Sequence, residues 1–265
     1  MSIMELSSSE IKFFKDNGYL IKKIIPIDKI KALQQLLANM IRNSYTKNVK
    51  KIGKNVLEKE ILTNVFIELE MRSHSHVKKL FNHIRQTNKC YELITDSRVM
   101  EAINKIMRKK SNNDLFVNSV SLRMDPPGSK NFSYGWHTDS LVNVENSNFV
   151  QCWTPLVDID RELGGLEIVE KSHIKQVKTQ YSDEILKAVK KGEKNSNPIV
   201  YRTPHSTRII TPNVKKKSLT ANVGESILFS NKLMHRSGLN KSKDRVRFSL
   251  TAFYHDSNKI SSGWY

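Results

Sequence analysis

Three residues of the chain have the side chains and the spacing of a metal site. His137 and Asp139 are two residues apart within residues 134–139, and side chains two apart in an extended strand project from the same face. An imidazole and a carboxylate on one face can share a metal ion, and His235 is a candidate for the third ligand. Two histidines and one carboxylate leave coordination positions open, which is the ligand set of non-haem Fe(II) oxygenases.

A basic residue follows the second histidine in a place that suits a bound carboxylate. Residues 224–229 read as a strand, His235 follows, and a further strand begins near Arg247. A guanidinium can bind a carboxylate through two parallel hydrogen bonds. Two histidines, an aspartate and a downstream arginine are the groups that an Fe(II) enzyme needs to chelate a keto acid. The pair His137 and Asp139 alone does not identify such a site, because a chain with 8 histidines can contain one by coincidence.

The segments around these candidates read as short strands. After about residue 115 the apolar residues lose helical spacing, and short runs are bounded by Gly, Pro, Asn or Asp. The predicted strands cover residues 116–124, 149–157, 166–169, 199–202, 226–229 and 247–254. Several short strands with such boundaries predict a jelly roll. The long polar stretch 174–222, with a helix expected over 183–191, reads as a lid-like insertion.

The first 114 residues read as a largely helical support. Ser7 is among the serines that can cap a first helix, Gly18 ends it, and a short strand follows over 19–21. Asp28 is expected to cap a second helix, and apolar residues recur at helical spacing in it and in two later stretches, 77–84 and 99–106. No linker or repeat separates the two halves. We therefore expect one domain over residues 1–265, with a jelly-roll core over 115–258.

The charge composition indicates which classes of partner the chain could bind. The 265 residues carry 44 Lys and Arg against 26 Asp and Glu, a formal net charge of +18. This excess suits a nucleic acid or an anionic small-molecule substrate. The basic residues form only scattered short clusters, and no zinc-finger, RRM or basic-zipper pattern surrounds them, so we interpret most of the charge as solvated surface and do not expect nucleic-acid binding. Nothing in the sequence indicates an oligomeric state.

The sequence also suggests a compartment. No run approaches 18 consecutive apolar residues, so no membrane span is expected. The first residues lack the pattern of a secretory signal. Cys90 and Cys152 form neither a disulfide framework nor a zinc-finger spacing. We expect a cytoplasmic protein.

In addition, the sequence resembles the phytanoyl-CoA dioxygenase family of Fe(II)/2-oxoglutarate-dependent oxygenases along nearly its whole length. Residues 11–20 are similar to the opening helix and strand of the family, and residues 121–128 lead into the His-x-Asp segment as family members do. Further similar blocks lie at residues 153–160, 164–169, 172–173, 235–242 and 247–249. The blocks occur in the order of the family.

The resemblance implies a double-stranded β-helix (jelly-roll, cupin-like) core and a role for each motif residue. His137, Asp139 and His235 would be the ligands of Fe(2+) and the catalytic centre. Arg247 would bind the distal carboxylate of the co-substrate 2-oxoglutarate, with Ser249 beside it. Further roles implied by the resemblance are a cofactor-pocket position for Trp153 and a substrate-facing position for Arg123, together with residues of the 174–222 insertion. The reaction expected is C–H hydroxylation with O2, releasing succinate and CO2.

Some residues depart from the family pattern, and other functions stay open. Arg247 lies one residue beyond the usual spacing from His235 and Arg245 one residue short of it, and both are expected on one strand face. Asp139 stands where related halogenases carry a small residue, which favours hydroxylation or a related oxidation. His173 is interpreted as structural. The alternatives are a cupin-like binding protein without turnover and a nucleic-acid-directed oxygenase or binding module.

Overall fold

The structure is a computed structural model, and it places most of the chain. The residues that it describes are 5–109, 114–129, 135–139, 149–175, 177, 179–181, 207–209 and 214–259. The helix expected over 183–191 and the strand expected over 199–202 lie outside the described residues.

The first helix and the first strand follow the signals in the sequence. Helix α1 (Ser8–Asn17) begins after Ser7, whose side chain accepts from the backbone N–H of Glu10 in a capping box. It ends at Gly18, which has the left-handed backbone (φ +81°) that glycine adopts at low cost. Strand β1 (Tyr19–Lys23) follows directly.

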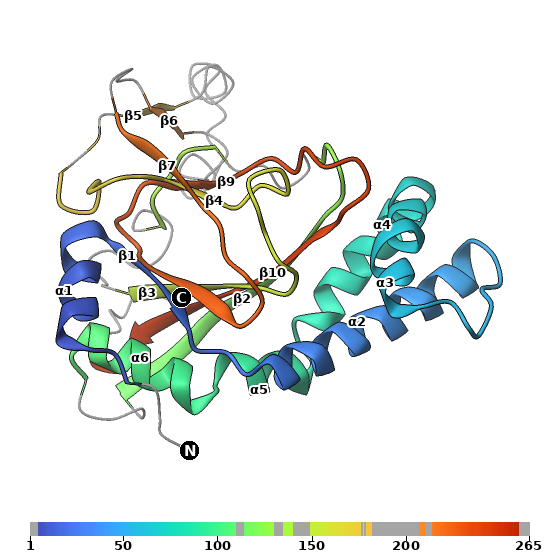
Figure 1. Ribbon diagram of the computed structural model, residues 1–265, viewed down its shortest axis with the longest axis horizontal. Coiled ribbons are helices and arrows are strands. Elements are labelled where there is room, and N and C mark those ends of the chain that lie inside the picture. Colours follow the sequence, from blue (N-terminus) through green and yellow to red (C-terminus); the bar gives the residue numbers. More distant parts are fainter. Residues whose placement is uncertain are drawn as a thin grey trace, which may run out of the picture.

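Helices make up the rest of the N-terminal part. In chain order they are α2 (Ile27–Asn48), α3 (Glu58–Glu60), the π-helical turn η1 (Ile61–Val65), α4 (Phe66–Ile84), α5 (Asn88–Ile94) and α6 (Ser97–Met107), with the short 3-10 helix η5 (Ser257–Lys259) near the C-terminus. Helix α2 starts after Pro26, so Asp28 lies in its first turn and not at the cap as expected. Asp96 caps α6 by accepting from Arg98 N–H. Figure 1 shows α2 to α4 reaching beyond the edge of the sheets.

Two facing antiparallel sheets form the core. Their further strands are β2 (Leu115–Asp125), β3 (Phe149–Pro155), β4 (Leu166–Val169), β7 (Lys216–Leu219), β8 (Glu225–Ser230), β9 (His235–Ser237) and β10 (Arg247–Asp256). The larger sheet has the order β1-β8-β3-β10-β2 and the smaller one the order β7-β4-β9. A separate pair joins β5 (Thr179–Tyr181) to β6 (Thr207–Ile209). This arrangement, mainly β with a helical N-terminal layer, confirms the predicted jelly roll.

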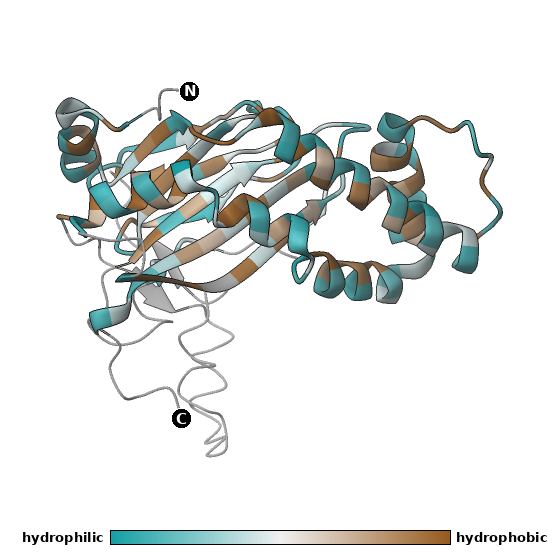
Figure 2. Ribbon diagram, turned by 90° about the horizontal axis from the view of Figure 1, so that it is seen from below, coloured by the Kyte–Doolittle hydropathy of each residue, from teal (hydrophilic) through white to brown (hydrophobic). Residues whose placement is uncertain are grey.

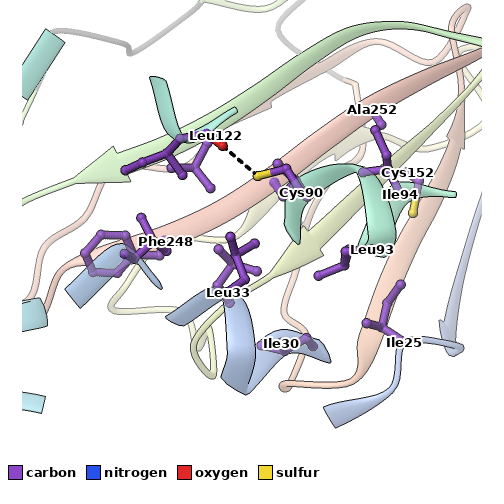
Figure 3. Packing of buried hydrophobic residues seen from close by; sticks show 14 of the residues in the cluster. Ile25, Ile30, Leu33, Cys90, Leu93, Ile94, Leu122, Cys152, Phe248 and Ala252 are labelled. Atoms are coloured by element: carbon purple, nitrogen blue, oxygen red, sulfur yellow. Dashed lines mark hydrogen bonds between the residues drawn. The ribbon is translucent and has the colours of Figure 1, made fainter. Parts of the chain in front are cut away.

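The two faces of the larger sheet have different partners. Alternate residues of β10, such as Phe248, Leu250 and Tyr254, face the helices and join one large core cluster with them. Figure 3 shows this packing from close by, and Figure 2 shows hydrophobic stretches recurring along both the strands and the helices. The opposite face of the sheet looks into the space between the sheets, where Trp153 and Phe229 meet residues of the smaller sheet in a second cluster.

Part of the segment read as an insertion belongs to the barrel. Strand β7 pairs with β4 in the smaller sheet, so the insertion within residues 174–222 ends before Lys216. The sequence hides this strand because only Leu219 of its residues is buried, which leaves no alternating apolar pattern. Among the described helices, none is both long and apolar enough to cross a membrane.

Candidate metal centre

The three predicted ligands come together from two backbone segments between the sheets. His235 is the first residue of β9, and its backbone pairs with that of His137 in an isolated β-bridge. Each of the two residues donates its N–H to the carbonyl of the other, at 3.0 and 2.9 Å. Asp139 N–H donates to the carbonyl of Asn231, just after β8 (3.0 Å). The segment 135–139 is therefore held by backbone bonds on both sides of its ligands.

The side chains of these three residues converge. The Nε2 atoms of His137 and His235 lie 3.7 and 3.4 Å from the carboxylate oxygens of Asp139. One ligand atom from each residue lies within 4.8 Å of the other two, and all three residues are buried. Phe229 of β8 places its ring edge on His235, with ring centroids 4.9 Å apart. The centre thus faces the interior surface of the larger sheet.

Backbone carbonyls fix the orientation of both imidazoles. Nδ1 of His137 is 2.7 Å from the carbonyl of Gly135, and Nδ1 of His235 is 2.9 Å from the carbonyl of Leu233. A carbonyl can only accept, so each Nδ1 carries a proton and Nε2 is the nitrogen turned to the centre that can bind a metal. Burial lowers the pKa of His137 to about 4, and the neighbouring His235 acts in the same direction. His137 is therefore neutral and able to bind a metal at physiological pH.

The donor set fits a first-row transition metal ion. Two imidazole nitrogens and one carboxylate oxygen on the same side are the donors of a facial triad, which leaves positions open on the other side. Within the part of the chain that the structure describes, no other group of His, Cys, Asp or Glu converges in this way.

An ionic cluster lies next to this centre. Asp125 of β2 accepts from two arginines: Arg123 through Nε and Nη2 (3.2 and 2.8 Å), and Arg247 through Nε and Nη2 (3.0 and 2.9 Å). Arg247 also donates to the carbonyls of Gly164 and Gly238. Burial alone would raise the pKa of Asp125, but the two arginines hold it below its usual value. Counted over these three residues alone, two guanidiniums and one carboxylate give this buried cluster one positive charge in excess.

Two glycines let the backbone segments around Arg247 lie close to one another. A Cβ atom at Gly164 would collide with the carbonyl of Leu239, and one at Gly165 would collide with the carbonyl of Leu219. Gly164 also has a positive φ of +79°. Gly164 therefore lets the segment before β4 lie against the segment after β9, and Gly165 lets it lie against the end of β7. The carbonyls of Gly164 and Gly238, from the first two of these segments, accept from the Arg247 guanidinium.

The structure separates the two arginines that the sequence left as alternatives. Arg247 is the first residue of β10 and is buried, 4% exposed. Arg245 precedes the strand, and its guanidinium pairs at the surface with Asp160 (2.9 Å) and Glu162 (2.8 Å). The expectation that both arginines lie on one strand face is wrong, because β10 begins only at Arg247. Arg123, expected from the sequence to face the substrate, pairs with Asp125 in the same buried cluster as Arg247.

The remaining predicted residues lie on the interior face of the larger sheet. Ser249 pairs in register with Arg123, and its fully buried hydroxyl has no hydrogen-bond partner among the described residues. Trp153 packs in the cluster between the sheets. His173 lies elsewhere: its Nε2 donates to the carbonyl of Lys15 at the end of α1 (2.8 Å), in line with its interpretation as structural.

Sequence reasoning missed three interior polar residues, Asp125, Gln151 and His255. His255, near the end of β10, is 2% exposed. The signal that could have found them is strand alternation. Each lies an even number of residues from a residue already expected to face the site: Asp125 from Arg123, Gln151 from Trp153 and His255 from Ser249.

Comparison with known proteins gives a family match and several similar folds. The family model described as phytanoyl-CoA dioxygenase (PhyH) matches residues 14–249. No curated protein matches the chain.

The similar solved structures cover nearly the whole chain at low sequence identity. EvdO2 from Micromonospora carbonacea var. aurantiaca, complexed with 2-oxoglutarate, has a TM-score of 0.56 at 12% identity and covers 95% of this chain and 91% of its own. The α-ketoglutarate-dependent carbocyclase SnoK from nogalamycin biosynthesis has a TM-score of 0.59 at 14% identity, covering 97% and 86%. The epimerase SnoN, complexed with Fe3+, α-ketoglutarate and nogalamycin RO, has a TM-score of 0.57 at 13% identity, covering 94% and 82%.

Proposed function

The chain belongs to the phytanoyl-CoA dioxygenase family, whose members are Fe(II)/2-oxoglutarate-dependent oxygenases, and on that basis we propose that it oxidises a C–H bond of a small molecule. The reaction would consume the substrate, 2-oxoglutarate and O2, and release the hydroxylated product, succinate and CO2. The observation that carries the proposal is the placement of the His137, Asp139 and His235 triad beside a buried cluster with excess positive charge.

Fe(II) would be held by His137, Asp139 and His235, the residues that the sequence already indicates as metal ligands and catalytic centre. Their two imidazole nitrogens and one carboxylate would bind one side of the ion, and the open positions would take 2-oxoglutarate and O2. When bound, the iron would supply the activation of O2 that C–H oxidation requires. The carbonyls of Gly135 and Leu233 keep the imidazoles oriented for it.

The distance between the triad and the arginines suits 2-oxoglutarate. His235 and Ser237 are two residues apart on β9, which corresponds to about 7 Å along a strand. Ser237 Oγ accepts from Arg123 Nη1 (3.3 Å), so the guanidinium cluster begins one such step from the metal ligands. A five-carbon dicarboxylate is long enough to bridge this step, with its keto-acid end at the metal and its distal carboxylate at the cluster.

Three groups would receive the distal carboxylate. Arg247 and Arg123 supply the excess positive charge, and the unpartnered hydroxyl of Ser249 belongs to a residue that pairs in register with Arg123 and follows Arg247 by two positions on β10. A carboxylate bound there would neutralise the cluster and satisfy that hydroxyl. Arg123, expected from the sequence to face the substrate, is thereby assigned to the co-substrate. Trp153 would form an apolar wall of the same space.

The proposal is tested by turnover of 2-oxoglutarate. Purified protein supplied with Fe(II), ascorbate and 2-oxoglutarate is expected to form succinate slowly without substrate, and His137→Ala is expected to abolish this. His83→Ala, which removes an exposed histidine of α4, is the matched control. Adding a metabolite extract should yield a compound heavier by about 16 mass units, one oxygen atom. Succinate formation at an unchanged rate in His137→Ala would refute the proposal.

A further inference from the structure

The interior face of the larger sheet continues beyond the metal centre, away from the arginines. Successive interior positions of β10 are Arg247, Ser249, Thr251, Phe253 and His255. Arg247 belongs to the ionic cluster and Ser249 pairs in register with Arg123 of that cluster, whereas Phe253 and His255 pair in register with Gln151 and Phe149 of β3. The face is therefore ionic at one end and aromatic and uncharged at the other.

Gln151 lies close to the metal centre on this uncharged end. It pairs in register with Phe229, the residue whose ring contacts His235, and on its other side with Phe253. Gln151 is 1% exposed, yet its Nε2 has no hydrogen-bond partner among the described residues. A buried amide without a partner is costly, so its presence beside the centre points to a ligand that accepts from it.

His255 completes the row. Its ring stacks on Phe149 on one side and on Phe116 on the other, with centroids 4.4 and 5.0 Å apart. Its Nε2 is also buried without a partner among the described residues. Burial lowers the pKa of His255 to about 4, so the ring is uncharged at neutral pH.

Two charged side chains near this end, Asp256 and Lys217, already have partners. Asp256, the next residue of β10, alternates to the opposite face and pairs with Lys109 (2.5 Å). Lys217 donates to the hydroxyl of Tyr19 (2.7 Å) on β1, and β8 lies between β1 and the strand of Gln151. Asp256 is paired on the opposite face and Lys217 is bonded to β1, one strand beyond the neighbour of Gln151, so neither lies beside Gln151 as a counter-charge. A charged substrate group at Gln151 would thus lose its hydration without an adjacent opposite charge from these two residues.

We propose that Gln151 and His255 recognise an uncharged substrate that carries a carbonyl or hydroxyl oxygen on an apolar or aromatic body. The amide of Gln151 would donate to that oxygen beside the metal, and His255 Nε2 would make a second hydrogen bond to it or to a neighbouring oxygen. Phe149 and Phe253 would contact the apolar body. This inference rests on the proposed function and specifies the substrate class of the same site.

Probes of equal size and different charge test the inference. The protein is loaded with Zn(II) and 2-oxoglutarate, which prevents turnover, and titrated with acetophenone, ethylbenzene, benzoate and benzylamine by ligand-detected NMR. Acetophenone is expected to bind most tightly. Gln151→Leu should weaken acetophenone about 5- to 10-fold, as expected for one lost hydrogen bond, and leave ethylbenzene within about twofold. No acetophenone binding, tighter binding of benzoate or benzylamine, or unchanged acetophenone affinity in Gln151→Leu would each overturn it.

Unfolding of the ligand-free protein provides a second measurement. Gln151→Leu and His255→Phe remove buried polar atoms that lack partners, and the phenyl ring preserves the stack with Phe116 and Phe149. Both variants are therefore expected to raise the thermal midpoint, as substitutions at ligand-binding residues often do. A lower midpoint in both would assign them a purely structural role and overturn the inference. If the wild-type protein with Fe(II) forms no succinate, the proposed function is refuted. The two failures can be told apart, because the binding of the probes is measured in the Zn(II)-loaded protein and does not depend on turnover.

Discussion

The backbones of His137 and His235 pair with each other through two hydrogen bonds, so the two nitrogen ligands of the candidate metal centre form one β-bridge. The next residue on each segment, Trp136 before His137 and Arg236 after His235, points to the opposite side, the outer face of the smaller sheet, where the two side chains are in contact. The Arg236 guanidinium sits 4.7 Å from the Trp136 ring and pairs with Glu167 of β4 (2.7 Å). The outer contact thus connects the bridge to the rest of its sheet.

Loss of the Trp136 ring is expected to weaken metal binding. The ring is buried and contributes both its apolar area and the contact with Arg236, on the order of 1 kcal/mol for the contact alone. We expect Trp136→Ala to reduce Co(II) affinity about tenfold, measured by the absorption of bound Co(II). Tyr91→Ala, which removes an exposed aromatic ring of α5, should leave the affinity unchanged. Unchanged Co(II) affinity in Trp136→Ala would show that the bridge holds without the outer contact.

The arginines are expected to differ sharply in their effect on 2-oxoglutarate. A charge-assisted hydrogen bond contributes roughly 1.5–3 kcal/mol, so Arg247→Ala and Arg123→Ala should each weaken 2-oxoglutarate binding by about 10- to 100-fold. Arg245→Ala is the matched control, since its guanidinium pairs with Asp160 and Glu162 at the surface. Calorimetric titration of the Zn(II)-loaded protein measures all three. A loss with Arg245→Ala as large as that with Arg247→Ala would contradict the assignment.

Asp125 is expected to matter for stability. Asp125→Asn would remove the carboxylate charge that pairs with both Arg123 and Arg247, and breaking a buried ion pair costs about 3–5 kcal/mol. Asp160→Asn removes a surface partner of Arg245 and should cost less than about 1 kcal/mol. Urea unfolding of both variants gives the comparison. Similar losses in the two variants would mean that the buried cluster is not a stabilising unit.

The sequence predicted those parts of the site that depend on local spacing. His137 and Asp139 lie two residues apart in the sequence and their side chains converge as that spacing predicts, and Gly18 ends α1 because the left-handed conformation favours glycine. Both features are determined within a few residues. The same holds for the capping box at Ser7.

The parts that the sequence did not predict depend on contacts between distant segments. Asp125 joins Arg247 across 122 positions, so neither residue reveals the pair on its own. Strand β9 is three residues long and β7 is mostly exposed, so neither carries a periodic apolar pattern. Arg245 and Arg247 look equivalent in the sequence and become distinct only where β10 begins.

Acid is expected to destabilise the metal-free protein through His137 and His255. Burial lowers the pKa of each to about 4 in the folded state, whereas an unfolded histidine titrates near 6.5. Between these values the unfolded chain binds protons that the folded chain does not, so stability falls as the pH falls from about 6.5 to about 4. Each such proton contributes about 1.4 kcal/mol per pH unit. His255→Phe should therefore show a shallower decline in urea unfolding between pH 6.5 and 4.5, and an unchanged slope would contradict the buried, neutral state of His255.

Gly18 and His173 are expected to be energetically coupled. A Cβ atom at Gly18 would collide with the His173 imidazole, in addition to the strain of a positive φ, so Gly18→Ala should cost clearly more than the roughly 1 kcal/mol typical of such strain. Gly128→Ala is the matched control, because Gly128 has φ +68° and nothing within 4 Å of the added atom. Adding His173→Ala should recover part of the loss in Gly18→Ala, which a double-mutant cycle in urea measures. Strictly additive losses, or equal losses in the two glycine variants, would show that the imidazole can move aside and does not lock the end of α1 to the turn after β4.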